Sequence, residues 1–216
     1  MYGVDCVDIY YLHNPETQLG EVTRMEFSRR LRAAFEFLES ACAAGKIRYF
    51  GMATWNGFRQ PAKARDFLSL AETERLAREA AGGPHHFRFV QLPFNLAMTE
   101  ALTRPNQPLD GDKGGAVTPA VASSVTMVEA AEAFGISLIA SASLLQGKMA
   151  KELPQFIRDT LGLANDAERS LQFVRSAPGM KTALVGMSSV AHVRANLRLV
   201  SEPLATGEQF SGLFRG

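Results

Sequence analysis

Five short apolar runs recur along the chain, each rich in β-branched or aromatic residues. Runs of this length and composition are typical of β-strands. They cover residues 7–12, 47–53, 87–92, 136–140 and 182–186, and their starts lie 40 to 49 residues apart. The spacing leaves room for one helix after each strand.

The clearest helical pattern covers residues 26–44. Its apolar positions step by three or four and therefore share one face of a helix. Gly45 stands where a glycine commonly ends a helix. The positions on the predicted buried face are Phe27, Leu31, Phe35, Leu38 and Cys42.

The same order returns near the C-terminal end. Asn165 or Asp166 is suited to cap a helix, Pro178 and Gly179 stop it, and an apolar run follows at once. Repeated strand, helix and strand units indicate a parallel sheet with right-handed crossovers. We expect residues 1–216 to form a single domain.

Residues 103–118 form the one long Pro/Gly-rich stretch. We expect an irregular loop insertion on the C-terminal side of the strands, either as a lid or as a disordered segment.

Two architectures accommodate five such units. An open doubly wound sheet is complete with five strands, whereas a (β/α)8 barrel needs eight. The periodicity alone favours the open sheet. However, that fold should carry a glycine-rich phosphate loop after its first strand, and "HNPETQLGE" contains none.

Composition and charge exclude several classes of function. The 216 residues carry 23 Lys and Arg against 22 Asp and Glu, so nothing favours a nucleic-acid or anionic-membrane partner. No apolar stretch is long enough to span a bilayer, and the start "MYGVDCVDIYYL" lacks the pattern of a signal peptide. We therefore expect a cytoplasmic protein.

Cysteine and histidine usage gives no metal site. Cys6 and Cys42 are too few for a disulfide framework, and we expect both to be small buried side chains. No group of His, Cys, Asp and Glu has the spacing of metal ligands.

The stretch "VDIYYLHNP" ends an apolar strand in His13, Asn14 and Pro15. Proteins with parallel sheets place their chemistry where a strand ends and a loop begins. His13 is therefore either a functional side chain or a residue that satisfies a loop hydrogen bond.

Five motifs together resemble a known family. "VDIYYLHNP", "AFEFLESACAAGKIRYFGMATWN", "FRFVQLPFNL", "GISLIASASLLQG" and "FVRSAPGMKTALVGMSSVAHVRANL" follow the order and spacing of the fourth to eighth strand-helix units of the aldo-keto reductases. The resemblance covers about residues 4 to 200. It implies a partial (β/α)8 TIM barrel, in the α/β class.

The resemblance implies hydride transfer from a reduced nicotinamide to an aldehyde or ketone. His13 matches the His that polarises the carbonyl, and Asn14 leads into the substrate loop. Trp55 either walls the substrate pocket or covers the core. The family's catalytic Asp, Tyr and Lys belong to the second and third units and have no counterpart here. Tyr11 is expected to be a core aromatic residue rather than a replacement acid.

Three positions correspond to nicotinamide contacts. Gln91 matches the Gln that binds the carboxamide, although it could simply satisfy a strand end. Thr54 stands where the family often has Asn and keeps one hydroxyl for the same group. Ser141 replaces the aromatic residue that would stack on the nicotinamide ring, which is a departure from the family.

The last motif resembles the turn that holds the adenosine phosphate at a helix N-terminus. Gly186, Ser188, Ser189 and Asn196 match that turn, whereas His192 and Ala195 replace its usual Gln and Glu. The expected cofactor is NADP, with NAD not excluded.

Three hypotheses remain. In the first, these residues are a fragment of an NADP-dependent oxidoreductase. In the second, the chain is a non-catalytic relative that binds a nucleotide or a protein. In the third, it is an open five-stranded α/β binding protein. In the first two cases the exposed edges of a partial barrel would favour self-association. The first predicts a small carbonyl compound as substrate, of unknown identity.

Overall fold

The computed structural model describes residues 3–109 and 124–214, and its contacts gather in two compact units. The first unit comprises Met1–Leu92 and Glu100–Ser137, and the second comprises Pro93–Thr99 and Leu138–Gly216. That the whole chain forms a single domain stays a prediction.

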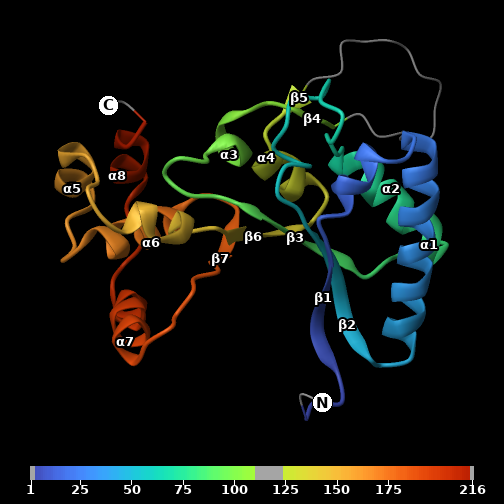
Figure 1. Ribbon diagram of the computed structural model, residues 1–216, viewed down its shortest axis with the longest axis horizontal. Coiled ribbons are helices and arrows are strands. Elements are labelled where there is room, and N and C mark those ends of the chain that lie inside the picture. The colour runs from blue at the N-terminus through green and yellow to red at the C-terminus, as the bar shows by residue number, and fades with distance from the viewer. Residues whose placement is uncertain (1–2, 110–123, 215–216) are drawn as a thin grey trace. The chain divides into compact units, whose positions relative to one another are not determined.

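Strands and helices alternate through most of the chain (Figure 1). In chain order the elements are β1 (Val7–His13), η1 (Pro15–Gly20), α1 (Arg24–Ala43), β2 (Ile47–Ala53), α2 (Leu70–Ala81), β3 (Phe87–Pro93), α3 (Glu100–Thr103), β4 (Gln107–Pro108), β5 (Ser124–Val125), α4 (Met127–Ala133), β6 (Ser137–Ser141), η2 (Leu145–Ala150), α5 (Gln155–Leu161), α6 (Asp166–Ser176), β7 (Met180–Ala183), α7 (Val190–Arg198), η3 (Leu199–Ser201) and α8 (Gly207–Gly212).

The five long strands form a sheet whose order, β1-β2-β3-β6-β7, follows the chain. The pairs β1-β2, β2-β3 and β6-β7 are parallel. An open doubly wound sheet reverses its strand order at a switch point, whereas a barrel adds strands in sequence. The order among the described strands therefore agrees with the predicted partial barrel and not with the open-sheet hypothesis.

Four of the five predicted strands match to within one residue at each end. The last one was misplaced, because β7 covers Met180–Ala183 rather than 182–186. Gly179, with φ of 75°, turns the chain directly into the strand. The N–H of Leu184 donates to the carbonyl of Ala140 at 2.8 Å, and the chain then leaves the sheet.

Helix α1 buries the face that the pattern predicted. Phe27, Leu31, Phe35 and Leu38 are buried, whereas Cys42 is only half-buried. The Phe35 ring lies 5.3 Å from Phe50 on β2 and 5.5 Å from Phe87 on β3, measured between ring centroids. These three side chains are inaccessible to solvent and form the core of the first unit.

The second unit has its own aromatic core. Phe94 and Phe210 lie on either side of Phe173, each with its ring centroid 5.3 Å from that of Phe173 and nearly parallel to it. Phe173 comes from α6 and Phe210 from α8, so the stack joins these two helices.

The predicted irregular segment 103–118 is described only as far as residue 109. Within that part, Gln107 and Pro108 form β4 and pair antiparallel with β5. The Gln107 side chain is buried and its Oε1 accepts from the N–H of Leu70 at 2.8 Å. The start of the segment is therefore ordered by a buried amide, and residues 110–118 lie outside the described residues. No helix in the described part of the chain is long and apolar enough to cross a membrane.

We predict that Phe35→Ala lowers the free energy of unfolding by about 3–5 kcal/mol, because it removes a buried ring and leaves a cavity. The matched control is Phe37→Ala on the same helix, where the side chain is 71% exposed. Urea titration followed by circular dichroism measures both variants. Equal stability losses in the two variants would contradict the proposed core.

Candidate functional site

Three residues in the first unit form a row across the ends of three strands. His13 on β1 is paired with Ala53 on β2, and Ala53 is paired with Gln91 on β3. Neighbouring strands lie about 4.8 Å apart, so His13 and Gln91 flank the small Ala53 side chain at about twice that separation. The row combines an imidazole, a methyl group and an amide at the carboxyl ends of the three strands.

The row lies on the face of the sheet opposite α1. Phe50 packs on Phe35 of α1, and side chains alternate along a strand, so Gly51 and Ala53 lie on the same face as each other and opposite Phe50. The parallel register places His13 and Gln91 on that same face.

A bulge in β3 gives Gln91 this orientation. The register shifts between Phe50 and Gly51, so Phe50 is opposite Phe87 and Gly51 is opposite Phe89. A shift of one residue moves every later side chain to the other face. The backbones approach so closely there that a Cβ on Gly51 would lie 2.3 Å from the carbonyl oxygen of Phe89. The glycine therefore permits the bulge that exposes Gln91 on the site face.

Thr54 follows the row directly and carries an unsatisfied hydroxyl. Its N–H donates to the carbonyl of Gln91 at 2.9 Å, and the residue is 4% exposed. Its Oγ1 is buried without a hydrogen-bond partner among the described residues. A buried polar atom left unpaired costs about 1–3 kcal/mol, so this atom is suited to a ligand that supplies a donor or acceptor.

His13 is exposed, and no hydrogen bond of its imidazole is found within the described residues. Among residues 3–109 and 124–214, no loop hydrogen bond accounts for this histidine. Asn14 follows with φ of 47° and donates its N–H to the carbonyl of Ala53 at 2.6 Å. This left-handed residue turns the chain away from β1.

The backbone of Trp55 is held by buried charges. Glu16, 2% exposed, accepts through Oε1 from the N–H groups of Trp55 at 2.8 Å, Asn56 at 3.1 Å and Gly57 at 3.4 Å. Arg59 donates through Nη1 to the Trp55 carbonyl at 2.9 Å. The Trp55 side chain itself is 48% exposed.

Arg59 is in turn paired with Glu100, whose Oε1 lies 3.0 Å from Nη2. Burial raises the pKa of Glu100, but the hydrogen bond and charge of Arg59 outweigh it and hold the pKa below its ordinary value. Sequence reasoning missed both Glu16 and Arg59. A glutamate three residues past a strand has no feature that distinguishes it from an ordinary surface residue.

Tyr11 lies two residues before His13 and on the same face, deeper along β1. Burial raises the pKa of its phenol, which makes the hydroxyl a weaker acid. Tyr11 is half-buried and is not one of the buried core residues of the described chain, so its role as a core aromatic residue stays a prediction.

The second unit contains a cavity of about 750 Å³ between η2, α6 and α7. Three of the residues predicted to hold the adenosine phosphate line it, namely Gly186, Ser188 and Asn196. His192, Ala195 and Ala167 also contribute to the lining, which contains no Lys or Arg. Most of the lining side chains are small or apolar, and the polar ones are those of Ser143, Gln146, Ser188, His192 and Asn196.

Two predicted residues do not line the cavity. Ser189 is the N-cap of α7, and its hydroxyl accepts from the N–H of His192 at 3.2 Å. The carbonyl of Ser141 accepts from the N–H of Phe94 at 3.1 Å, which ends β6. The structure thus gives Ser189 a role in forming the helix end, while Ser188 reaches the cavity.

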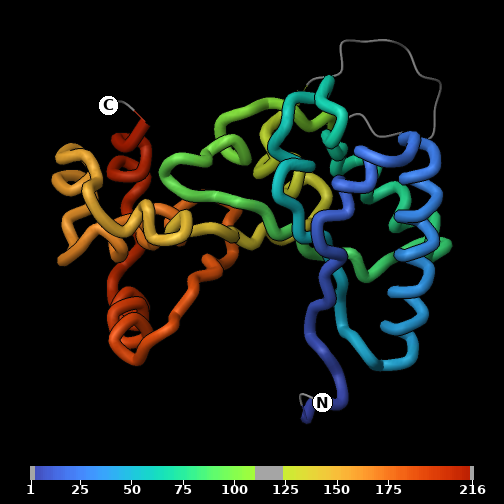
Figure 2. Tube along the Cα trace, in the orientation of Figure 1, coloured from blue at the N-terminus to red at the C-terminus, as the bar shows by residue number. Residues whose placement is uncertain are grey.

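One wall of the cavity has an unusual backbone. Four of its residues have a positive φ, between 45° and 85°. They are Ala142, Leu145, Gln146 and Gly147. Non-glycine residues adopt this region at a cost, and such residues concentrate at functional sites. Residues 184–188 also line the cavity. They belong to the extended segment that leads from β7 to α7 (Figure 2).

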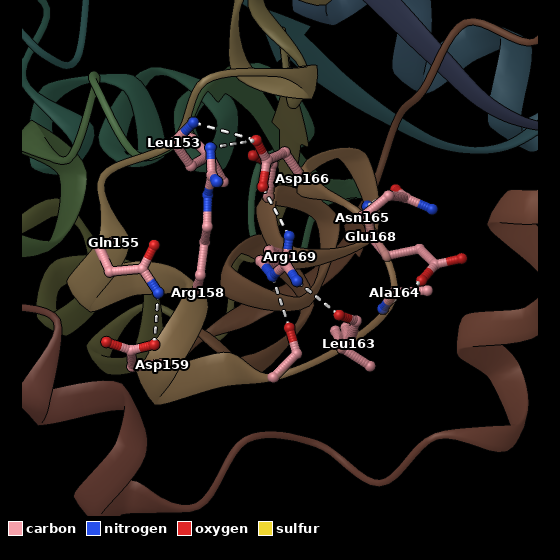
Figure 3. A network of polar contacts seen from close by, with 12 residues as sticks. Leu153, Gln155, Arg158, Asp159, Leu163, Ala164, Asn165, Asp166, Glu168 and Arg169 are labelled. Atoms are coloured by element: carbon pink, nitrogen blue, oxygen red, sulfur yellow. Dashed lines mark hydrogen bonds and ion pairs between the residues drawn. The ribbon is translucent and has the colours of Figure 1, made fainter.

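A polar network organises the start of α6 (Figure 3). Asp166 accepts from the N–H of Leu153 at 3.1 Å through Oδ2 and from Arg169 at 2.6 Å through Oδ1. The hydrogen bond from Leu153, followed by the contacts with Arg169, lowers the pKa of Asp166. The network fixes the helix that carries Ala167 to the cavity.

No group of three or more metal-ligating side chains is found among residues 3–109 and 124–214.

No family model matches the sequence, and no curated protein matches it. Solved structures do match. An aldo-keto reductase from Bacillus halodurans, AKR11C1 in its holo form, is 16% identical over 98% of this chain and 61% of its own, with a TM-score of 0.59.

Two further structures match to a similar degree. The thermostable aldo-keto reductase Tm1743, in complex with the inhibitor epalrestat, is 18% identical over 97% of this chain and 60% of its own, with a TM-score of 0.61. A putative 2,5-diketo-D-gluconic acid reductase B is 15% identical over 97% and 56%, also with a TM-score of 0.61.

The chain thus spans about 60% of the length of the solved structures that it matches. These matches confirm the resemblance that the five motifs indicated, at the level of the fold. Over the strand-helix units that it includes, the chain has the fold of the aldo-keto reductases.

Proposed function

We propose that the chain is part of an NADP-dependent oxidoreductase of the aldo-keto reductase type, which reduces an aldehyde or ketone. The observation that supports this most is the row at the strand ends in the first unit. His13 and Gln91 flank Ala53 there, and the adjacent Thr54 carries a buried hydroxyl without a partner among the described residues. A row of this kind has the hydrogen-bonding groups that a substrate carbonyl and a neighbouring nicotinamide carboxamide would need.

The residues present fit the two ends of such a cofactor. Thr54 and Gln91 would hold the carboxamide, since an amide can pair with both the orphaned hydroxyl and the glutamine side chain. Gly186, Ser188 and Asn196 would hold the adenosine phosphate, with Ser189 forming the helix end behind them. When bound, the reduced nicotinamide supplies the hydride.

His13 would bind the substrate oxygen. An exposed imidazole at the end of a strand can donate one hydrogen bond to a carbonyl and so polarise it. Trp55, on a backbone fixed by Glu16 and Arg59, would bound the substrate pocket together with Asn14. We propose that proton transfer to the substrate oxygen depends on a Tyr, assisted by a Lys and an Asp, that the 216 residues do not include.

The alternative is a non-catalytic relative that binds a nucleotide or a protein. The replacement of the stacking aromatic by Ser141 favours it, because the nicotinamide ring then lacks a platform. The absence of cations from the cavity lining also favours weak rather than tight phosphate binding. Two further parts of the proposal have other grounds. The cytoplasmic location rests on the sequence, and the choice of NADP rather than NAD rests on the resemblance to the family.

We predict that the purified 216-residue chain shows no measurable NADPH-dependent reduction of a reactive aldehyde. Correctly placed general acid catalysis is typically worth about 10² to 10⁴ in rate, and Tyr11 is too deep in the strand to supply it. The assay follows NADPH absorbance against a complete aldo-keto reductase as positive control. Turnover that disappears in Tyr11→Phe would show that Tyr11 is the acid after all.

We predict that nucleotide binding persists and is dominated by the adenosine-phosphate end. Calorimetric titration should give dissociation constants between tens of micromolar and millimolar for NADP and 2′-phospho-AMP, a few kcal/mol weaker than a micromolar site. Nicotinamide mononucleotide should hardly bind, because Ser141 offers no stacking surface.

Ser188→Asp should abolish binding of 2′-phospho-AMP, because it places a negative charge beside the phosphate. Ser201→Asp introduces the same charge at an exposed serine that does not line the cavity, and it should leave binding unchanged. Tight binding of the nicotinamide fragment, or unchanged binding in Ser188→Asp, would place the phosphate elsewhere.

A further inference from the structure

Helix α7 is attached to the second unit with little hydrophobic packing. None of its nine residues, Val190–Arg198, all of which the structure describes, is fully buried. Val190 and Leu197 are 67% and 57% exposed. Most helices are held by an apolar face that packs on the core, so α7 requires another means of attachment.

Charged side chains supply that attachment at the C-terminal end of the helix. Arg198, the last residue of α7, donates to Oε1 of Glu168 on α6 through Nη2 at 2.5 Å and through Nε at 3.2 Å. From α6, Arg175 donates to the carbonyl of Leu199, and at 3.1 Å to that of Glu202. Two arginines thus tie the end of α7 and the residues after it to α6.

Glu168 is suited to this role because its carboxylate is buried and fixed. The residue is 5% exposed, and its second oxygen accepts from the N–H of Ala164 at 3.2 Å. Figure 3 shows it on the first turn of α6, beside the network of Asp166 and Arg169. The partner Arg198 has a side chain that is 61% exposed, so the buried member is the carboxylate.

The ion pair joins the two helices that wall the cavity. Glu168 follows Ala167, which lines the cavity from α6, and Arg198 lies two residues after Asn196, which lines it from α7. Loss of the pair would let α7 shift and would change the positions of Ser188 and Asn196.

We propose that Glu168 and Arg198 are positioning residues of the nucleotide site, acting as a latch that sets the place of α7 against the cavity. The proposal deepens the proposed function and rests on it where nucleotide affinity is concerned. The latch itself is a statement about α7 and is tested separately.

The experiment combines two measurements on the full chain. The first is hydrogen exchange of the α7 amides, and the second is calorimetric titration with 2′-phospho-AMP. We use Glu168→Gln, Arg198→Gln and the double variant. The control is Glu36→Gln, which removes a pair between exposed side chains on α1, Arg32 and Glu36, 3.5 Å apart.

Each single variant should speed exchange of the α7 amides and weaken 2′-phospho-AMP binding by about tenfold, because either change removes one member of a partly buried pair. The double variant should lose little more than one single variant, since the two residues act as a pair. Glu36→Gln should change neither quantity.

The possible outcomes separate the two proposals. If the wild-type chain binds no nucleotide while Glu168→Gln still frees α7, the proposed function fails and the latch stands. If α7 exchange is unchanged in both single variants, or if the two losses add fully in the double variant, the latch is wrong. Faster exchange with unchanged affinity would show that the pair holds the helix without positioning the site.

Discussion

The site in the first unit depends on the close contact between Gly51 and the backbone of β3. The contact leaves no space for a side chain, and it accompanies the bulge that shifts the register by one residue. Because strand side chains alternate, this single shift decides whether Gln91 lies on the face of His13 or on the face of α1. Phe87, before the bulge, packs on Phe35 of α1, and Gln91, after it, lies on the opposite face. One glycine thus lets the same strand serve the core and the site.

Buried charged side chains hold the segments that do not pack into the apolar cores. Glu16 and Arg59 hold the Trp55 backbone in the first unit, and Glu168 and Arg198 hold α7 in the second. A buried charged group that loses its partners is left unsatisfied, which is costly. Such contacts are directional, so they hold a loop or a short helix in one position. The few apolar contacts of an exposed segment would not define that position.

The elements that the sequence predicted correctly are those whose signals are local. The face of α1, the caps and four of the five strands follow from periodicity and from a few residue types. The misplaced β7 shows the limit, because its position depends on its register with β6, in which Met180 is paired with Leu138 and Ala183 with Ala140, and no local pattern encodes that register. Glu16 and Glu168 were missed for the same reason. Their roles come from partners 39 and 30 residues away along the chain.

The two candidate subsites differ in how much of their chemistry is present. The strand-end row offers an imidazole and an amide, and Thr54 directly after it carries a buried hydroxyl without a partner among the described residues. These groups are able to orient a carbonyl and a carboxamide. The cavity of the second unit offers space, a helix N-terminus and Ser188, but no Lys or Arg among its lining residues. A phosphate there would rely on backbone N–H groups and the helix dipole, whose contribution is about 0.3–1 kcal/mol and is screened by salt. If the cavity binds the nucleotide as we propose, its lining predicts weak, salt-sensitive binding. The position of α7 would then decide whether those N–H groups reach the ligand.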